Sequence, residues 1–182
     1  FVLRRTIERP ITAPPEEADI NPDKLIIYQN PQNQRYIPTD KLIEDIEKHK
    51  FLVIASPMGS GKTHSIIEWI KQHPDYKFLV IGTRIQQIAA WYSKFANLGF
   101  KNYETIQGSL YSESRLLVCL NSLPRLLGRI DPATNFAPIP QYDALIIDEA
   151  DSLARWLGGP LLTESPLIFM ILQVLISKNS RH

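Results

Sequence analysis

The sequence predicts an α/β fold with a mainly parallel β-sheet. Short apolar runs of strand length, at residues 51–55, 77–81, 116–120 and 144–147, alternate with segments whose apolar residues recur at helical spacing. This alternation is typical of β-α-β units, in which helices cover a parallel sheet. Two of the runs end in polar motifs, and open α/β sheets bind ligands at the carboxyl ends of their strands.

The chain is expected to begin with an irregular segment. Residues 1–36 are rich in Pro, Gln and Asn, which predicts an extended arm with a short strand over residues 25–28. Residues 37–182 are then expected to form one domain, since a chain of 182 residues can bury a single substantial core. Thr39 is expected to cap the first helix, whose last turn carries basic residues near Lys48 that suit the helix dipole.

Four further helices are predicted along the rest of the chain. One follows the first apolar run, over residues 62–72, and a second covers residues 88–98 and stops at Gly99. A short helix is expected near residues 123–129. Ser165 with the following Pro starts a last helix over residues 166–178 that is apolar on nearly every face, which predicts an exposed apolar patch. A buried edge strand is the alternative for this last segment.

A glycine-rich stretch directly follows the first apolar run and has the pattern of a P-loop. Its residues are Ser56, Pro57, Met58, Gly59, Ser60, Gly61, Lys62 and Thr63. In such a turn the backbone N–H groups form an anion site at a helix N-terminus. Lys62 is expected to reach the β- and γ-phosphates of ATP, and the Thr63 hydroxyl to bind Mg²⁺. Ser56 stands where the strict pattern has Gly, which exchanges one small residue for another.

A second polar motif follows the apolar run at residues 144–147. Asp148 is expected to hold Mg²⁺ through water, and Glu149 to polarise the water that attacks the γ-phosphate. Together with Lys62, Glu149 is the candidate catalytic residue. The alternative is that both acids cap a helix beginning near Ala150. The presence of the P-loop pattern upstream favours the nucleotide-binding interpretation over this alternative.

Composition limits the classes of function. The net charge of +1 argues against a stand-alone, high-affinity nucleic-acid binder, although not against a domain that contacts the backbone through a few residues. The single cysteine, Cys119, cannot form an internal disulfide, which favours an intracellular protein, cytoplasmic or, if viral, nuclear. No signal peptide or membrane-length apolar run is visible. The chain begins with Phe1 rather than Met, which suggests a fragment or a processed product.

The two motifs resemble motifs I and II of superfamily 2 helicases, the DEAD-like group. Residues 80–84 are similar to motif Ia of that group, and residues 118–126 are similar to the segment that precedes motif II. The Ser-Pro-Met of the P-loop and the Asn-Ser-Leu at residues 121–123 most resemble the origin-binding helicases of herpesviruses and related plasmid-replication helicases of cyanobacteria. The resemblance covers about residues 35–178.

This resemblance implies a P-loop NTPase fold, a RecA-like three-layer sandwich that forms the first, ATP-binding lobe of a DNA helicase-like replication protein. The implied cofactors are ATP and Mg²⁺, and the implied partner is nucleic acid, DNA in the first instance, contacted along its backbone. Thr83, Arg84 and Ser122 would make those contacts. Arg84 could equally be a solvated residue at a helix start, and Ser122 could cap the helix at Leu123.

The chain also departs from the family pattern. No Ser-Ala-Thr-like motif III follows Asp151, and nothing corresponds to the second helicase lobe with its arginine finger. ATP hydrolysis is therefore expected within a longer protein, with the isolated chain close to inactive. Two other classes stay open: a P-loop ATPase motor unrelated to helicases, and a non-catalytic lobe that binds nucleotide or DNA as a scaffold.

Several aromatic and basic residues have two interpretations. Trp91 with Tyr92 and Phe95 could stack on bases, but their helical spacing favours a face turned to the core. Arg35 and Tyr36 could contact the adenine side of a nucleotide, with a surface loop as the favoured alternative. Arg125 is expected to be a surface residue.

Overall fold

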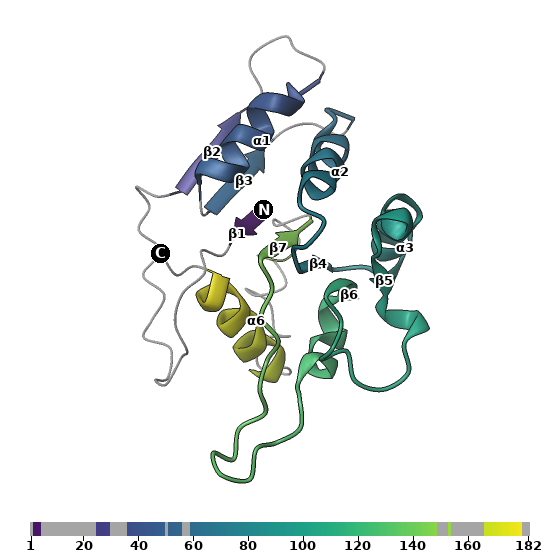
Figure 1. The fold of residues 1–182 in the computed structure, drawn as a ribbon, viewed down its shortest axis with the longest axis vertical. Helices are drawn as coiled ribbons and strands as arrows, with labels where there is room; N and C mark the ends of the chain where they lie inside the picture. The colour runs from purple at the N-terminus through teal and green to yellow at the C-terminus, as the bar shows by residue number, and fades with distance from the viewer. Residues whose placement is uncertain are drawn as a thin grey trace.

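The computed structural model describes residues 2–4, 25–29, 36–49, 51–55, 59–148, 153 and 166–179. Within these residues the strands form one seven-stranded sheet in the order β2-β3-β1-β7-β4-β6-β5 (Figure 1). The strands are β1 (Val2–Arg4), β2 (Leu25–Gln29), β3 (Phe51–Ala55), β4 (Phe78–Gly82), β5 (Lys101–Asn102), β6 (Arg115–Cys119) and β7 (Ala144–Ile147).

Strand β4 lies at the centre of a parallel block made of β7, β4, β6 and β5. All five residues of β4 are buried, and its backbone pairs with β7 on one side and β6 on the other. Strands in a parallel sheet are covered on both faces, so they appear in the sequence as continuous apolar runs. The predicted α/β fold with a parallel sheet is confirmed.

The arm expected over residues 1–36 contributes two strands to the sheet. The predicted strand near residues 25–28 is confirmed as β2, which pairs in parallel with β3. Strand β1 was not predicted, and it lies between β3 and β7, antiparallel to both. Because β3 and β7 both oppose β1, they run in the same direction as each other. Every described strand except β1 therefore points the same way.

The predicted helices are present, with small shifts at their ends. They are α1 (Thr39–Lys48), α2 (Lys62–Gln72), α3 (Ile85–Phe95) and α6 (Pro166–Asn179). In Figure 1, α3 lies beside β5 and β6, and α6 lies beside β7. The 3₁₀ turns η2 (Ala96–Leu98) and η3 (Tyr103–Thr105) follow α3 and β5. The short helix expected near residues 123–129 is a 3₁₀ helix, η4 (Leu120–Leu126), which starts immediately after β6.

Thr39 does not cap α1, contrary to the prediction. The N-cap position is Pro38, and no side chain caps the helix there. The Thr39 hydroxyl instead lies 3.1 Å from the Ser65 hydroxyl on α2. A second bond joins the same two helices, because Trp69 Nε1 donates to Glu47 Oε1 at 2.5 Å. Thr39 and Glu47 of α1 therefore contact side chains of α2, and Thr39 does not cap its own helix.

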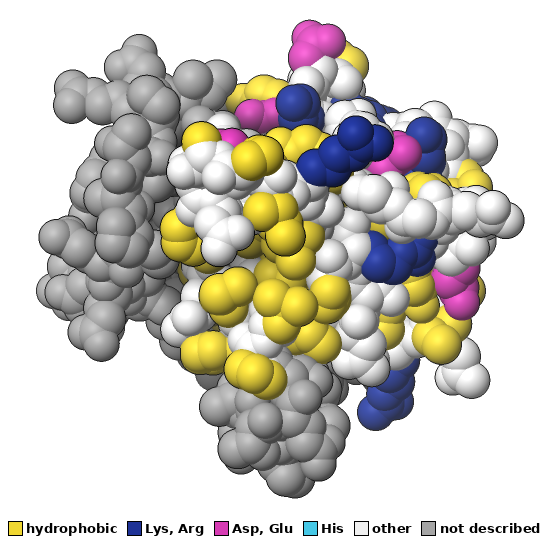
Figure 2. Space-filling view, turned by 90° about the horizontal axis from the view of Figure 1, so that it is seen from below, with side chains coloured by type: hydrophobic (Ala, Val, Ile, Leu, Met, Phe, Trp, Pro, Cys, Tyr) yellow, Lys and Arg dark blue, Asp and Glu magenta, His cyan; other side chains and the backbone are white. Residues whose placement is uncertain are grey.

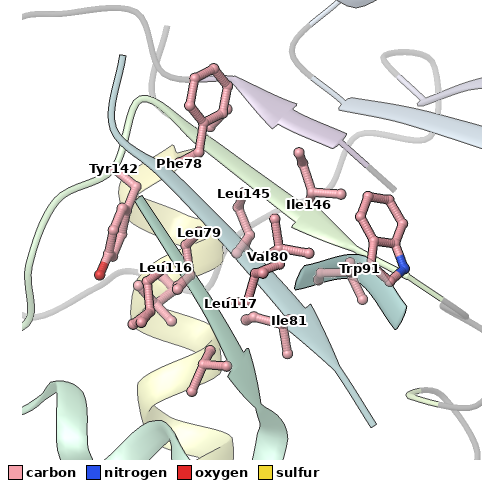
Figure 3. Packing of buried hydrophobic residues seen from close by; sticks show 14 of the residues in the cluster. Phe78, Leu79, Val80, Ile81, Trp91, Leu116, Leu117, Tyr142, Leu145 and Ile146 are labelled. Carbon is pink, nitrogen blue, oxygen red and sulfur yellow. The ribbon is translucent and has the colours of Figure 1, made fainter. Parts of the chain in front are cut away.

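One contiguous core fills the space between the sheet and the helices (Figure 3). Trp91 and Phe95 belong to it, being 8% and 0% exposed, and their rings stack with centroids 4.7 Å apart. The core interpretation of this aromatic set is confirmed, as is the burial of Cys119 in β6.

Arg125 is not a surface residue, contrary to the expectation. It is partly buried, and its guanidinium donates to the backbone carbonyls of Tyr103, Ile106 and Gly108. Because an Arg side chain presents several donors and no acceptor, one residue can satisfy several carbonyls of an irregular segment. Arg125, which belongs to η4, thus holds the loop that follows η3.

The last helix is covered on one face and exposed on another. Residues 166–179 form the helix α6, so the helix prediction is right and the edge-strand alternative is wrong. One face of α6 is buried, and it carries Ile168, Ile171, Leu172 and Leu175. Its other face carries exposed apolar side chains, with Leu167 at 40% and Met170 at 49% exposure. Figure 2 shows apolar side chains gathered in the centre of one face of the molecule. None of the described helices has the length and apolarity to cross a membrane.

Tyr142 carries a buried polar group whose removal is expected to stabilise the protein. Its side chain is 1% exposed, and its hydroxyl has no hydrogen-bond partner among the described residues. An unsatisfied buried hydroxyl costs about 1–3 kcal/mol. Tyr142→Phe is therefore expected to raise the free energy of unfolding by about 1 kcal/mol or more in urea titrations at pH 7. Tyr111→Phe, at a residue that is 40% exposed, is the matched control and should change little.

The same substitution should flatten the loss of stability at alkaline pH. Burial raises the pKa of Tyr142 well above its ordinary value, and the nearby charge of Glu113 acts in the same direction. In the unfolded chain this phenol ionises near pH 10, whereas in the folded chain it stays protonated. The unfolded state then binds fewer protons, so stability falls as the pH rises past about 10. A Tyr142→Phe variant that is less stable than wild type at pH 7, or that loses stability equally fast above pH 10, would contradict this account.

Candidate functional site

The candidate residues follow strands that end at one edge of the sheet. Because β3, β4, β6 and β7 run in the same direction, their carboxyl ends face the same edge. The segments that leave these ends are residues 56–63 after β3, residues 83–84 after β4, residue 122 soon after β6 and residue 148 after β7. The fold therefore gathers segments that are far apart in the sequence.

The second half of the P-loop pattern forms a tight turn at the start of α2. Gly59 and Gly61 have φ angles of +76° and +86°, a region that residues with a Cβ rarely adopt. The turn is tied to the preceding segment, because the Ile37 N–H donates to the Ser60 carbonyl at 2.8 Å. Lys62 and Thr63 are the first residues of α2. Ser56, Pro57 and Met58 lie outside the described residues.

Lys62 and Asp148 lie close enough to interact electrostatically. Burial lowers the pKa of Lys62, and the negative charge of Asp148 acts in the opposite direction. The Asp148 N–H donates to the Ile81 carbonyl at 3.2 Å, which places the carboxylate directly at the end of β4. Glu149, the candidate catalytic carboxylate, lies outside the described residues, as does Asp151.

Two side chains of α3 donate hydrogen bonds to the Asp148 carboxylate, and no sequence pattern had singled them out for this role. Gln87 Nε2 lies 2.9 Å from Asp148 Oδ2, and Trp91 Nε1 lies 2.6 Å from the same oxygen. Figure 3 shows Trp91 near the carboxyl end of β7. Residues four apart lie on one face of a helix, so Gln87 and Trp91 can both reach the same group. The sequence feature that could have indicated this role is a polar residue, Gln87, one helical turn before the core residue Trp91.

Thr83 and Arg84 form the turn between β4 and α3. The Thr83 N–H donates to Gln87 Oε1 at 3.0 Å, whereas the Thr83 hydroxyl is buried and has no partner among the described residues. Arg84 is exposed and occupies the N-cap position of α3 in an extended conformation. Next to it, Ile85 is 55% exposed.

Ser122 does not cap a helix at Leu123. It lies within η4, whose N-cap is Cys119. Burial raises the pKa of the nearby Tyr103, and the Ser122 side chain acts in the opposite direction. A contact between Ser122 and nucleic acid stays a prediction.

Tyr36 lies beside the turn at residues 59–61, whereas Arg35 lies outside the described residues. A Cβ built on Gly61 would stand 3.8 Å from Tyr36 Cδ1, and the Tyr36 side chain is 58% exposed. The adjacent bond from Ile37 to Ser60 holds this segment against the turn. Tyr36 is thus an exposed aromatic residue next to the proposed phosphate site.

The described groups suit a magnesium nucleotide. A turn with two left-handed glycines at a helix start can present backbone N–H groups to an anion; Lys62 and Thr63 follow this turn directly, and the charge of Asp148 acts on Lys62. Mg²⁺ prefers oxygen ligands and commonly takes only one or two carboxylates from the protein. Thr63 and Asp148 are the residues that would hold it.

The fold and the placement of these residues define an α/β protein with a candidate site at the carboxyl edge of a parallel sheet. The chain belongs to the origin of replication binding protein family, whose model matches residues 31–182. No solved structure gives a significant match.

Three viral relatives illustrate the family. The "Uncharacterized putative helicase R8" of Acanthamoeba polyphaga mimivirus is 31% identical over 147 residues, which cover 78% of this chain and 14% of that protein. The "Putative replication origin-binding protein" of the same virus is 36% identical over 118 residues, 64% of this chain and 14% of that protein. The "Replication origin-binding protein" of varicella-zoster virus (strain Dumas) is 30% identical over 135 residues, 71% of this chain and 15% of that protein. The matches thus span only 14% to 15% of these relatives.

Proposed function

We propose that this chain is the ATP-binding lobe of a superfamily 2 DNA helicase-like replication protein, with a RecA-like P-loop fold. The observation that carries the proposal is that the charge of Asp148, which follows β7, acts on Lys62 at the start of α2, where Thr63 is the next residue. In superfamily 2 helicases these positions bind the phosphates and Mg²⁺ of ATP. The family match and the relative named as a helicase support the same assignment.

In this proposal each residue has a separate task at the phosphates. The backbone of residues 59–61 surrounds the β-phosphate, and the Lys62 ammonium neutralises charge on the β- and γ-phosphates. Thr63 and Asp148 would hold Mg²⁺, which would neutralise negative charge that develops on the phosphates. Glu149 orients a water molecule in line with the γ-phosphate and accepts its proton as a general base. Tyr36 packs against the adenine side of the nucleotide in this proposal, which its exposure and its position beside Gly61 support.

The segments that follow β4 and β6 are proposed to contact single-stranded DNA through Thr83, Arg84 and Ser122. Arg84 is exposed at the start of α3, and Thr83 and Ser122 lie at the ends of neighbouring strands. Contacts to phosphate position a nucleic acid without reading its sequence. The relatives named as origin-binding proteins support DNA as the partner.

Lys62→Ala is expected to weaken binding of Mg²⁺-ATP strongly. A hydrogen bond to a charged group contributes about 1.5–3 kcal/mol, so the dissociation constant should rise roughly 10- to 100-fold in isothermal titration. Lys71→Ala is the matched control, because Lys71 lies in the last turn of the same helix and makes an exposed pair with Glu68. Equal affinity in wild type and Lys62→Ala would overturn the proposed site.

Glu149→Gln is expected to lower a turnover that is already slow. An arginine finger contributes about 10³–10⁵ in rate in GTPases, and superfamily 2 helicases supply theirs from the second lobe. The 182-residue chain should therefore release phosphate far more slowly than a complete helicase. The Gln variant keeps the shape of the side chain but loses the carboxylate, so its residual rate should fall further at unchanged ATP affinity. Phosphate release at ordinary helicase rates, or a Glu149→Gln rate equal to wild type, would contradict the proposed roles.

A further inference from the structure

A continuous chain of hydrogen bonds joins the turn after β4 to the carboxylate after β7. The Thr83 N–H donates to Gln87 Oε1 at 3.0 Å, and Gln87 Nε2 donates to Asp148 Oδ2 at 2.9 Å. A backbone N–H can only donate and an ionised carboxylate can only accept. The Gln87 amide therefore satisfies both neighbours in one orientation only, with its oxygen toward Thr83 and its nitrogen toward Asp148.

The Gln87 amide lies against the end of β4. A Cβ built on Gly82 would stand 2.9 Å from Gln87 Oε1 and 2.9 Å from Ile88 Cδ1, so the side chains of α3 approach the end of β4 closely. Trp91 donates to the same carboxylate oxygen at 2.6 Å from one turn further along the helix. Asp148 consequently has two donors from α3, and one of them, Gln87, is also hydrogen-bonded to the β4–α3 turn.

The burial of the Thr83 hydroxyl links a DNA contact at this residue to the hydrogen bond between Thr83 and Gln87. Thr83 is a proposed DNA contact, yet its Oγ1 is buried and has no partner among the described residues. The hydroxyl reaches a phosphate only after the turn or the Thr83 side chain rearranges, and the backbone N–H of the same residue is bonded to Gln87. A movement of the turn therefore acts on the group that orients Asp148.

We propose that Gln87 is a positioning residue that couples the DNA-contacting turn at Thr83 and Arg84 to the magnesium-binding carboxylate of Asp148. The inference rests on the proposed function, and it names the hydrogen bonds through which DNA and Mg²⁺-ATP would affect each other's binding. When the turn moves on DNA, the bond to Gln87 Oε1 changes, and with it the bond from Gln87 Nε2 to Asp148. Coupling between two sites is reciprocal, so bound nucleotide changes DNA affinity by the same factor.

The test compares Gln87→Met with Gln86→Met in the whole 182-residue chain. Met keeps the length of Gln but lacks the amide, and Gln86 is the exposed neighbour on the same helix. The affinity for Mg²⁺-ATP is measured by isothermal titration with and without a saturating single-stranded oligonucleotide. In wild type and Gln86→Met we expect the oligonucleotide to change the dissociation constant about fivefold or more. In Gln87→Met this ratio should fall close to one, while the chain still binds both ligands.

A spectroscopic reading separates coupling from a general loss of structure. The Trp91 indole N–H reports directly on Asp148, and its NMR resonance is assigned with Trp91→Phe. Mg²⁺-ATP should shift this resonance in wild type and in both Met variants, because the Trp91 bond does not involve Gln87. The oligonucleotide should shift it in wild type and Gln86→Met but not in Gln87→Met.

The failure of the inference is distinguishable from the failure of the proposed function. Wild type that binds Mg²⁺-ATP and shows no effect of the oligonucleotide on affinity or on the Trp91 resonance overturns the coupling alone. An effect of equal size in Gln87→Met also overturns it. Wild type that binds no Mg²⁺-ATP overturns the proposed function, and the coupling with it.

Discussion

The parallel pairing of β4 with β7 is the interaction on which the arrangement of the site depends. The register sets Ile81 opposite Ile147, so the next residue after β7, Asp148, meets the end of β4 and the start of the β4–α3 turn. All residues of β4 are buried, and its other side is occupied by β6. A shift of register by one residue would turn every side chain of a strand to the opposite face. The burial of apolar β4 therefore helps to fix the position of the Asp148 carboxylate.

A carboxylate at this edge needs hydrogen-bond donors, since a partly buried charge is costly unless it is paired or hydrogen-bonded. The Gln87 amide and the Trp91 indole supply them, and the Lys62 ammonium adds a favourable charge nearby. Trp91 has two tasks at once, because its ring stacks on Phe95 in the core while its N–H reaches Asp148. An indole combines a large apolar surface with one polar donor, which suits a position between core and site. Phenylalanine could do only the first of these tasks.

Local sequence patterns predicted the parts of the structure that rest on local physics. The buried strands appeared as apolar runs, α3 as apolar residues at helical spacing, and the turn at residues 59–61 as glycines, which adopt positive φ there. What could not be predicted depends on pairing across the fold. Strand β1 is only three residues long and is defined by its two antiparallel neighbours. Thr39 and Arg125 were misassigned because their partners, Ser65 and the carbonyls near Tyr103, are distant in sequence. Gln87 was overlooked for the same reason, since its partner Asp148 lies 61 residues away.

The central claim is that a magnesium nucleotide binds between the turn at residues 59–63 and Asp148. A crystal structure of the chain with Mg²⁺ and a non-hydrolysable ATP analogue tests it most directly. The account predicts the β-phosphate against the backbone N–H groups of Gly59, Ser60 and Gly61, and the metal near Thr63 and Asp148. The hydrogen bonds from Gln87 and Trp91 to Asp148 should be present in the same crystal. A nucleotide bound away from this edge of the sheet, or phosphates that contact neither the turn nor Lys62, would contradict the account.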